Sequence, residues 1–233
     1  MSELFGSSDE LLSTFLHPWI GRQKWSDLPF NGQLRRARAV KELLGYFAPT
    51  VNIETGTYRG ITTEFLFKLT EVPTHTIEAN PELFIQSSHR FRALGSDCAI
   101  IAHLGDSAER LREILRGLDP HQDRVFAYLD AHWEESLPLA SELNHLVAWG
   151  GPFVAVIDDF FTGEGSAYGY DFYGDLVVGK TQIPRGFGLR LFVPDEPTYK
   201  ESGAMRGTGY LFSAEAMSRI DQDFIQRYSL KEI

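Results

Sequence analysis

The chain has 233 residues, of which 43% are hydrophobic and 23% charged, a composition typical of a globular protein with a sizeable core. The formal net charge of −10 argues against nucleic acid or an anionic membrane as the main partner, because both need clustered Lys and Arg. No apolar run approaches the roughly 18 residues of a membrane helix, and the first residues do not resemble a signal peptide. We therefore expect a cytoplasmic protein with a small-molecule partner; self-association is left open.

Cys98 is the only cysteine in the chain. An internal disulfide and a cysteine-based metal site are therefore excluded. The residues after Cys98 are apolar and typical of a strand, so we interpret this cysteine as structural.

The sequence before residue 33 is irregular. Apolar residues then recur at helical spacing over residues 33–48, until Pro49 stops the helix. Short strand patterns follow at residues 51–54, 75–78, 99–103, 125–129 and 153–157, with helical patterns between them at residues 62–69, 81–94, 108–115 and 137–147. This alternation predicts βαβ units and a parallel sheet with helices on both faces.

The pattern changes after Asp159. Residues 162–188 are rich in Gly and Tyr, which predicts a long functional loop. Residues 189–193 and 209–212 are predicted strands, and residues 214–227 a helix. We predict a Rossmann-like, doubly wound, mostly parallel seven-stranded sheet with an antiparallel edge strand. A single domain would then comprise an N-terminal lid and helix (1–48), a cofactor-binding core (49–160), and an acceptor loop with closing strands (161–233).

A glycine-containing turn follows the first predicted strand. It runs from Glu54 through Gly56 and Thr57 to Gly60 and opens a helix. Glycines let backbone approach a ligand closely, and a helix N-terminus offers free N–H groups. The spacing does not fit the dinucleotide pattern G-x-G-x-x-G. By itself, the turn is equally typical of strand–helix packing.

The next two strands also end in polar residues. Glu78 ends the second strand, where a carboxylate suits hydrogen bonding to ribose hydroxyls. Asp106 and Ser107 follow the third strand. Asp106 suits an adenine amino group and also suits the N-cap of the next helix; the two roles are compatible.

Three carboxylates follow the fourth and fifth strands. Asp130 ends the fourth, and Asp158 and Asp159 end the fifth. Unpaired carboxylates in one cleft repel each other, and a divalent cation such as Mg²⁺ would relieve this with all-oxygen ligands. The alternative is that one of the pair caps a turn and the others face water.

Together these motifs resemble the cofactor signature of class I S-adenosylmethionine-dependent methyltransferases, over residues 50–160. The Glu-x-Gly-x-x-x-Gly form of the turn is similar to that of metal-dependent O-methyltransferases, which include the catechol, caffeoyl-CoA and macrocin-type sugar enzymes. The three aspartates fall on the metal positions of that group.

The resemblance implies a role for each position. Gly56, Thr57 and Gly60 would line the methionine part of S-adenosylmethionine, with Glu54 near its amino group. Glu78 would hold the ribose, and Asp106 with Ser107 the adenine, while Asp130 would border the cofactor. Asp130, Asp158 and Asp159 would bind Mg²⁺ or another divalent cation.

The resemblance departs from the catechol-type pattern at the base. Those enzymes have a lysine soon after the first metal aspartate, whereas this chain has His132. We interpret His132 as the general base beside Asp130, since imidazole titrates near neutrality. The alternative roles for His132 are a metal ligand or a polar residue of the site without a part in catalysis.

Acceptor recognition is expected from the aromatic loop 168–174, and a lid from residues 30–33. The leading hypothesis is O-methylation of a small-molecule hydroxyl, on a sugar or another natural product. An NAD-type oxidoreductase, a hydroxylase-like relative and a non-catalytic partner subunit are the alternatives.

Overall fold

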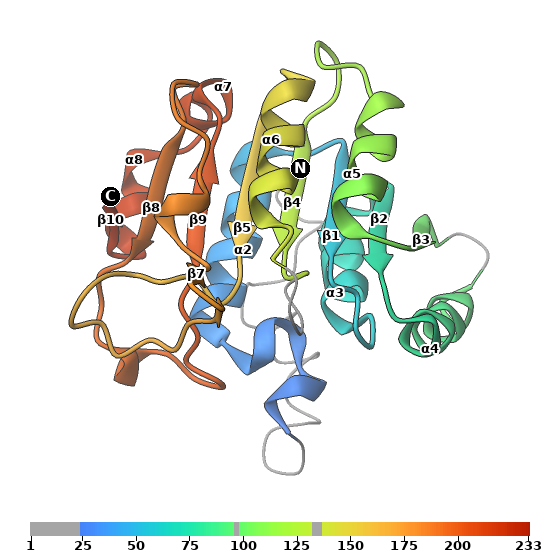
Figure 1. The fold of residues 1–233 in the computed structure, drawn as a ribbon, viewed down its shortest axis with the longest axis horizontal. Coiled ribbons are helices and arrows are strands. Elements are labelled where there is room, and N and C mark those ends of the chain that lie inside the picture. The colour runs from blue at the N-terminus through green and yellow to red at the C-terminus, as the bar shows by residue number, and fades with distance from the viewer. Residues whose placement is uncertain (1–23, 96–97, 132–136) are drawn as a thin grey trace, which may run out of the picture.

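A single sheet of eight strands organises the part of the chain that the computed structural model describes, residues 24–95, 98–131 and 137–233. The strand order is β10-β8-β9-β5-β4-β1-β2-β3 (Figure 1). Strands β1 to β5 are parallel, β9 is antiparallel to both β5 and β8, and β10 is antiparallel to β8. The strands of this sheet are β1 (Val51–Thr55), β2 (Thr74–Glu78), β3 (Ile100–Leu104), β4 (Val125–Leu129), β5 (Phe153–Ile157), β8 (Arg190–Pro194), β9 (Gly209–Phe212) and β10 (Leu230–Glu232).

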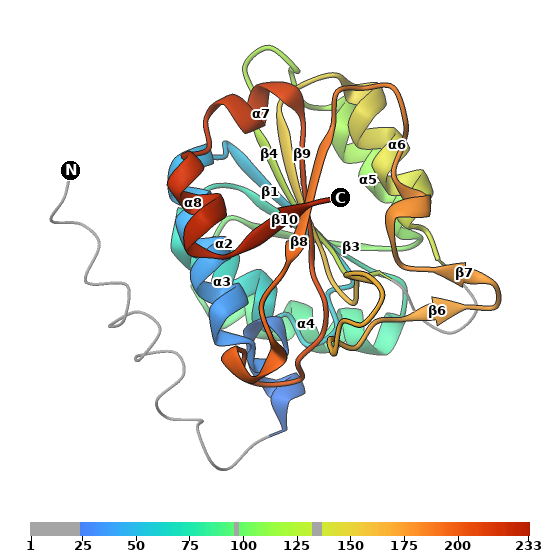
Figure 2. The same ribbon diagram turned by 90° about the vertical axis from the view of Figure 1, so that its left-hand side faces the viewer.

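Helices cover both faces of the sheet (Figure 2). Helices α2, α3 and α8 pack on one face, and α5 and α6 on the other. The helices are α2 (Leu34–Phe47), α3 (Ile61–Thr70), α4 (Pro81–Arg92), α5 (Ser107–Arg116), α6 (Leu139–Trp149), α7 (Ala214–Ser218) and α8 (Gln222–Arg227). None of the described helices is long and apolar enough to cross a membrane.

The predicted fold class is confirmed, with two corrections. The sheet has eight strands rather than seven, because the chain end forms β10 beside β8. The helix predicted over 214–227 is two short helices. Asp221 interrupts it by capping α8, since its side chain accepts a hydrogen bond from the backbone N–H of Asp223.

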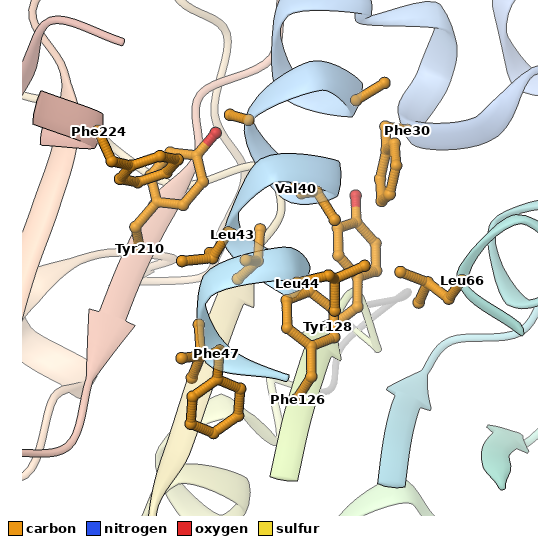
Figure 3. Close-up of a cluster of buried hydrophobic side chains, with 14 of the residues drawn as sticks. Phe30, Val40, Leu43, Leu44, Phe47, Leu66, Phe126, Tyr128, Tyr210 and Phe224 are labelled. Carbon is orange, nitrogen blue, oxygen red and sulfur yellow. The ribbon is translucent and has the colours of Figure 1, made fainter. Parts of the chain in front are cut away.

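Helix α2 packs against the middle of the sheet through aromatic and aliphatic side chains (Figure 3). Val40, Leu43 and Phe47 of α2 are fully buried. They meet Phe126 and Tyr128 of β4 in the same cluster. Burial at roughly 25 cal/mol per Å² of apolar surface makes this cluster a main source of stability. It fixes the N-terminus of α2 at the carboxyl edge of the sheet.

Two segments lie beside that carboxyl edge. The short 3₁₀ helices η1 (Trp25–Asp27) and η2 (Pro29–Gly32) precede α2 and lie below β1 and β4 in Figure 1. Between β5 and β8, the predicted long loop carries a small hairpin of β6 (Phe172–Tyr173) and β7 (Leu176–Val177) and the turn η3 (Lys180–Gln182). A further turn, η4 (Thr198–Lys200), lies between β8 and β9.

Candidate active site

A small cavity lies where the carboxyl ends of β1 and β4 meet the N-terminal segment, the position at which open α/β sheets bind ligands. The predicted residues Glu54, Gly56, Thr57 and Asp130 all line it. The other lining residues are Ser26, Leu28, Phe30, Asn31, Tyr58, Arg59, Ile61, Thr62 and Tyr128. The structure therefore brings together the glycine turn and the first aspartate of the predicted site.

The glycine turn is tightly packed at both glycines. Gly56 has φ +82°, and a Cβ there would come within 2.7 Å of the carbonyl carbon of Asp130. Gly60 has φ +72°, and a Cβ there would lie 2.5 Å from the ring of Phe91 in α4. Both positions need glycine for conformation and for space. Packing of the turn thus accounts for the two glycines whether or not a cofactor is bound.

Glu54 is buried at the end of β1. Its Oε2 accepts hydrogen bonds from Thr63 and from Thr76, the latter at 2.7 Å. Burial raises the pKa of Glu54 to about 7, because these two hydrogen bonds offset only part of the desolvation and the nearby Glu78 adds repulsion. A carboxyl that titrates near neutrality at the cavity wall suits an ammonium group as ligand.

Glu78 organises the turn from the neighbouring strand. Its Oε2 accepts from the backbone N–H of Tyr58 at 2.7 Å, and its Oε1 from that of Asn80 at 2.8 Å. A carboxylate has about four acceptor positions, and these bonds use two of them. Glu78 lies outside the small cavity, one strand further along the sheet.

Asp106 caps the N-terminus of α5, which is one of its two predicted roles. Its side chain accepts from the backbone N–H of Glu109 at 3.0 Å. Ser107 begins the helix and is buried. Both residues follow β3, at the edge of the sheet, and neither lines the cavity. A role toward adenine stays a prediction.

Asp158, which follows β5, is fully enclosed by hydrogen-bond donors. Its Oδ1 accepts from the guanidinium of Arg36 and from the backbone N–H of Asp159 at 2.7 Å. Its Oδ2 accepts from the hydroxyl of Tyr128 at 2.6 Å and from the side-chain amide of Asn31 at 3.4 Å. Neither Arg36 nor Asp158 is exposed. Asp158 is thus the centre of a buried polar network.

Asp159 points to a second arginine. Arg206, from the loop before β9, forms ion pairs with Asp159 and with Asp171 of the aromatic loop. The backbone N–H of Asp171 also donates to the carbonyl of Asp159 at 3.0 Å. These contacts tie the loop predicted for acceptor recognition to the end of β5.

Asp130 lies within the electrostatic field of these groups. Burial, and then the neighbouring Asp158 and Asp159, raise the pKa of Asp130 well above its usual range. Burial, and then the Asp158 carboxylate, also raise the pKa of the Tyr128 hydroxyl. Asp130 therefore holds a proton at the cavity wall more strongly than an ordinary aspartate does. The other predicted catalytic residue, His132, lies outside the described residues.

Within residues 24–95, 98–131 and 137–233, no group of three or more His, Cys, Asp or Glu side chains is placed to hold a metal ion. A carboxylate has about four acceptor positions, and four donors already occupy those of Asp158. The arrangement of Asp158 therefore does not fit a metal ligand. The predicted Mg²⁺ stays a prediction that nothing here supports.

Three residues with strained backbone line the cavity. Phe30 (φ 52°), Asn31 (φ 55°) and Tyr58 (φ 49°) have left-handed conformations. Such a conformation costs a non-glycine residue about 1–2 kcal/mol. Strained residues of this kind are typical of functional sites.

Sequence reasoning did not assign roles to Arg36, Tyr128 or Arg206. A signal existed for Arg36, because it precedes Val40 and Leu43 by four and seven residues and so lies on the buried face of α2. A charge on an apolar face requires a buried partner. The partner is separated by 122 positions in the chain, so the sequence could not identify it.

No family model and no curated protein sequence matches this chain. Solved structures do. An O-methyltransferase from Bacillus cereus, in complex with SAH, is 14% identical over 91% of this chain and 100% of its own, with a TM-score of 0.57. A candidate O-methyltransferase from Klebsiella pneumoniae is 14% identical over 91% and 92% (TM-score 0.56). A candidate caffeoyl-CoA O-methyltransferase from Staphylococcus aureus is 13% identical over 90% and 93% (TM-score 0.55).

These similarities extend over nearly the whole length of each chain at very low identity, so they concern the fold. The chain has a Rossmann-like fold, similar to that of these O-methyltransferase structures.

Proposed function

We propose that this protein binds S-adenosylmethionine at the carboxyl ends of β1 and β2 and transfers its methyl group to a hydroxyl of a small molecule. The observation that carries the proposal is the joint position of Glu54, Gly56, Thr57 and Asp130 around one cavity. The likeness to the SAH-bound Bacillus cereus structure supports it at the level of the fold.

The residues fit the parts of this cofactor. The carboxyl of Glu54, once ionised, would pair with the α-ammonium group of the methionine moiety. Glu78 retains acceptor positions for ribose hydroxyls beside its two backbone bonds. Asp106 and Ser107 lie one strand further, in the direction in which the adenine would extend.

The cofactor requires space that the N-terminal segment now fills. The cavity measures about 50 Å³, whereas pockets for drug-sized ligands measure roughly 300–1,000 Å³. Phe30 and Asn31 form its wall on the side opposite the glycine turn. We infer that the segment of residues 25–33 shifts when the cofactor enters, as the predicted lid would.

Methyl transfer itself is a displacement. The acceptor oxygen forms a bond to the methyl carbon, the carbon–sulfur bond breaks, and the sulfonium becomes the neutral thioether of SAH. Alignment of oxygen, carbon and sulfur supplies much of the rate, and a base must take the hydroxyl proton. We assign that proton to Asp130, which lines the cavity and, once ionised, is a stronger base than an ordinary aspartate, with His132 as the proposed partner.

The acceptor class is proposed to be a small, hydroxylated molecule bound against the aromatic loop. Tyr170 and Phe172 are exposed there, and aromatic faces stack on planar rings and sugars. A cytoplasmic site of action is proposed with it, and the acidic charge argues against a nucleic-acid or membrane partner.

The test is calorimetric titration of the protein with SAH, with NAD⁺ as the control ligand. We expect micromolar binding of SAH and none of NAD⁺. Binding of NAD⁺ alone would replace the proposal with an oxidoreductase, and binding of neither would reject it. A screen of hydroxylated acceptors with S-adenosylmethionine then identifies the product class.

A further inference from the structure

Two of the three carboxylates predicted to bind a metal, Asp158 and Asp159, are instead paired with arginines. Asp158 receives Arg36 and three further donors, which fill its acceptor positions. Asp159 receives Arg206. Two guanidinium groups carry the same total charge as one divalent cation.

Four hydrogen-bond acceptors hold the guanidinium of Arg36 in place. Its Nη1 donates to Asp158 and, at 3.2 Å, to the hydroxyl of Tyr128. Its Nη2 donates to the carbonyl oxygens of Arg206 at 2.8 Å and Gly207 at 3.1 Å. The planar fork of arginine matches such a set of fixed acceptors. A metal that displaced Arg36 from Asp158 would leave a buried charge without its partner, which costs several kcal/mol.

Arg206 is held from both sides. The side chain of Gln33 accepts from the backbone N–H of Arg206 at 2.7 Å and donates to its carbonyl at 2.9 Å. This fixes the backbone from which the guanidinium reaches Asp159 and Asp171. The arginine thus cross-links the end of β5 to the aromatic loop, as a bridging ion would.

We propose that Arg36 and Arg206 replace the divalent cation at this site, so that cofactor binding and methyl transfer require no metal. The first half of the proposal, that arginines occupy Asp158 and Asp159, stands on the contacts of these residues alone. The second half, that cofactor binding and methyl transfer require no metal, rests on the proposed function. Arg36 and Arg206 are positioning residues, because they act on the aspartates and the aromatic loop rather than on the reacting atoms.

Direct metal binding tests the first half. Purified protein is titrated with Mn²⁺ both without and with SAH, and the free ion is followed by electron paramagnetic resonance. We expect the free-ion signal to follow that of a protein-free titration through the submillimolar range. Saturable Mn²⁺ binding that weakens by about tenfold or more in the D159N variant would overturn the proposal. Asp159 suits this control because its side chain is partly exposed, and the wild-type titration decides even if the variant is unstable.

The second half is tested by SAH affinity in EDTA and in Mg²⁺, measured calorimetrically on the same preparation. We expect the two dissociation constants to agree within about a factor of two. A loss of affinity of about tenfold in EDTA would overturn metal independence. Absence of SAH binding in both buffers would instead reject the proposed function, while the Mn²⁺ titration still decides what neutralises the aspartates.

Discussion

Arg36 of α2 and Asp158 at the end of β5 form an ion pair in which neither side chain is exposed (1% and 0%). Burial lowers the pKa of Arg36, but the Asp158 carboxylate, with Tyr128 and Tyr210, raises it above its ordinary value, so the guanidinium stays charged. The pair connects the N-terminal helix to the strand end that carries the site. A change in this ion pair is therefore expected to alter both the stability of the protein and the position of α2 at the site.

Replacing Arg36 by Met is expected to lower the free energy of unfolding by about 3–5 kcal/mol, because it leaves Asp158 buried without its cation. Urea unfolding followed by circular dichroism measures this. The double variant R36M/D158N should recover part of the loss, since neither charge then remains.

The matched control is R219M. Arg219 pairs with Glu215 on the surface of α7, with side-chain exposures of 43% and 59%, and such pairs contribute about 0.5 kcal/mol or less. Equal losses of unfolding free energy in R36M and R219M would show that the buried pair stabilises the protein no more than a surface pair does.

Replacing Gly56 by Ala is expected to destabilise the protein and to abolish SAH binding. The new Cβ would collide with the backbone of Asp130, and φ +82° disfavours any side chain. The turn would then have to withdraw from the end of β4. Thermal unfolding and calorimetric titration measure the two effects.

Gly45, inside α2, is the control. A Cβ there meets nothing within 4 Å, so G45A should raise stability by about 0.5–1 kcal/mol through helix propensity. SAH affinity should not change. A G56A protein that retained wild-type SAH affinity would refute the placement of the cofactor against this turn.

Cofactor affinity is expected to depend on pH through Glu54. The free protein holds this carboxyl with a pKa of about 7, and an ammonium ligand favours its ionised form. The dissociation constant of SAH should rise by up to about tenfold for each pH unit below 7. The E54Q variant should bind more weakly at pH 8 and show no such pH dependence. A parallel pH profile in the two proteins would remove Glu54 from the cofactor site.

The same group gives the stability of the free protein a pH dependence of defined sign. Because the pKa of Glu54 in the folded protein lies above its ordinary value of about 4.5, the native state binds more protons than the unfolded state between these two values. Stability should therefore fall as pH rises from about 4.5 to about 7, by at most about 3 kcal/mol from this group. The difference in unfolding free energy between wild type and E54Q across that range isolates the contribution.

Replacing Phe30 by Ala is expected to speed SAH association several-fold. The ring of Phe30 packs edge-on against Phe65 and Tyr128 at centroid distances of 5.4 and 5.0 Å, and its removal loosens the segment that fills the cavity. Stability should fall by about 3–5 kcal/mol, as for other buried phenylalanines. Stopped-flow mixing with SAH gives the rate.

Phe224 provides the control for general destabilisation. It is fully buried in the same cluster but lies at the opposite end of that cluster from Phe30 (Figure 3). F224A should lose similar stability and keep the wild-type association rate. Equal rates in the two variants would show that the segment does not limit entry.

The sequence by itself determined the layered architecture and one half of the site. Strands at residues 125–129 and 153–157 were predicted with the bounds that the structure has, because buried parallel strands are continuous apolar runs. The antiparallel strand at residues 209–212 was also predicted with its observed bounds. Parallel strands end at one edge of the sheet, so Glu54 and Asp130 could be placed near each other from their strand ends alone. Their joint cavity agrees with this.

Only the tertiary structure decided what surrounds the aspartates. The donors to Asp158 come from residues 31, 36 and 128 as well as from its own neighbour, and Arg206 reaches Asp159 from 47 positions away. Local patterns report the faces and ends of elements, whereas the pairing of charges depends on which elements pack together. The three aspartates predicted a divalent cation, whereas the structure pairs Asp158 and Asp159 with arginines. The packing of α2 against β4 and β5 delivers Arg36 to the end of the sheet.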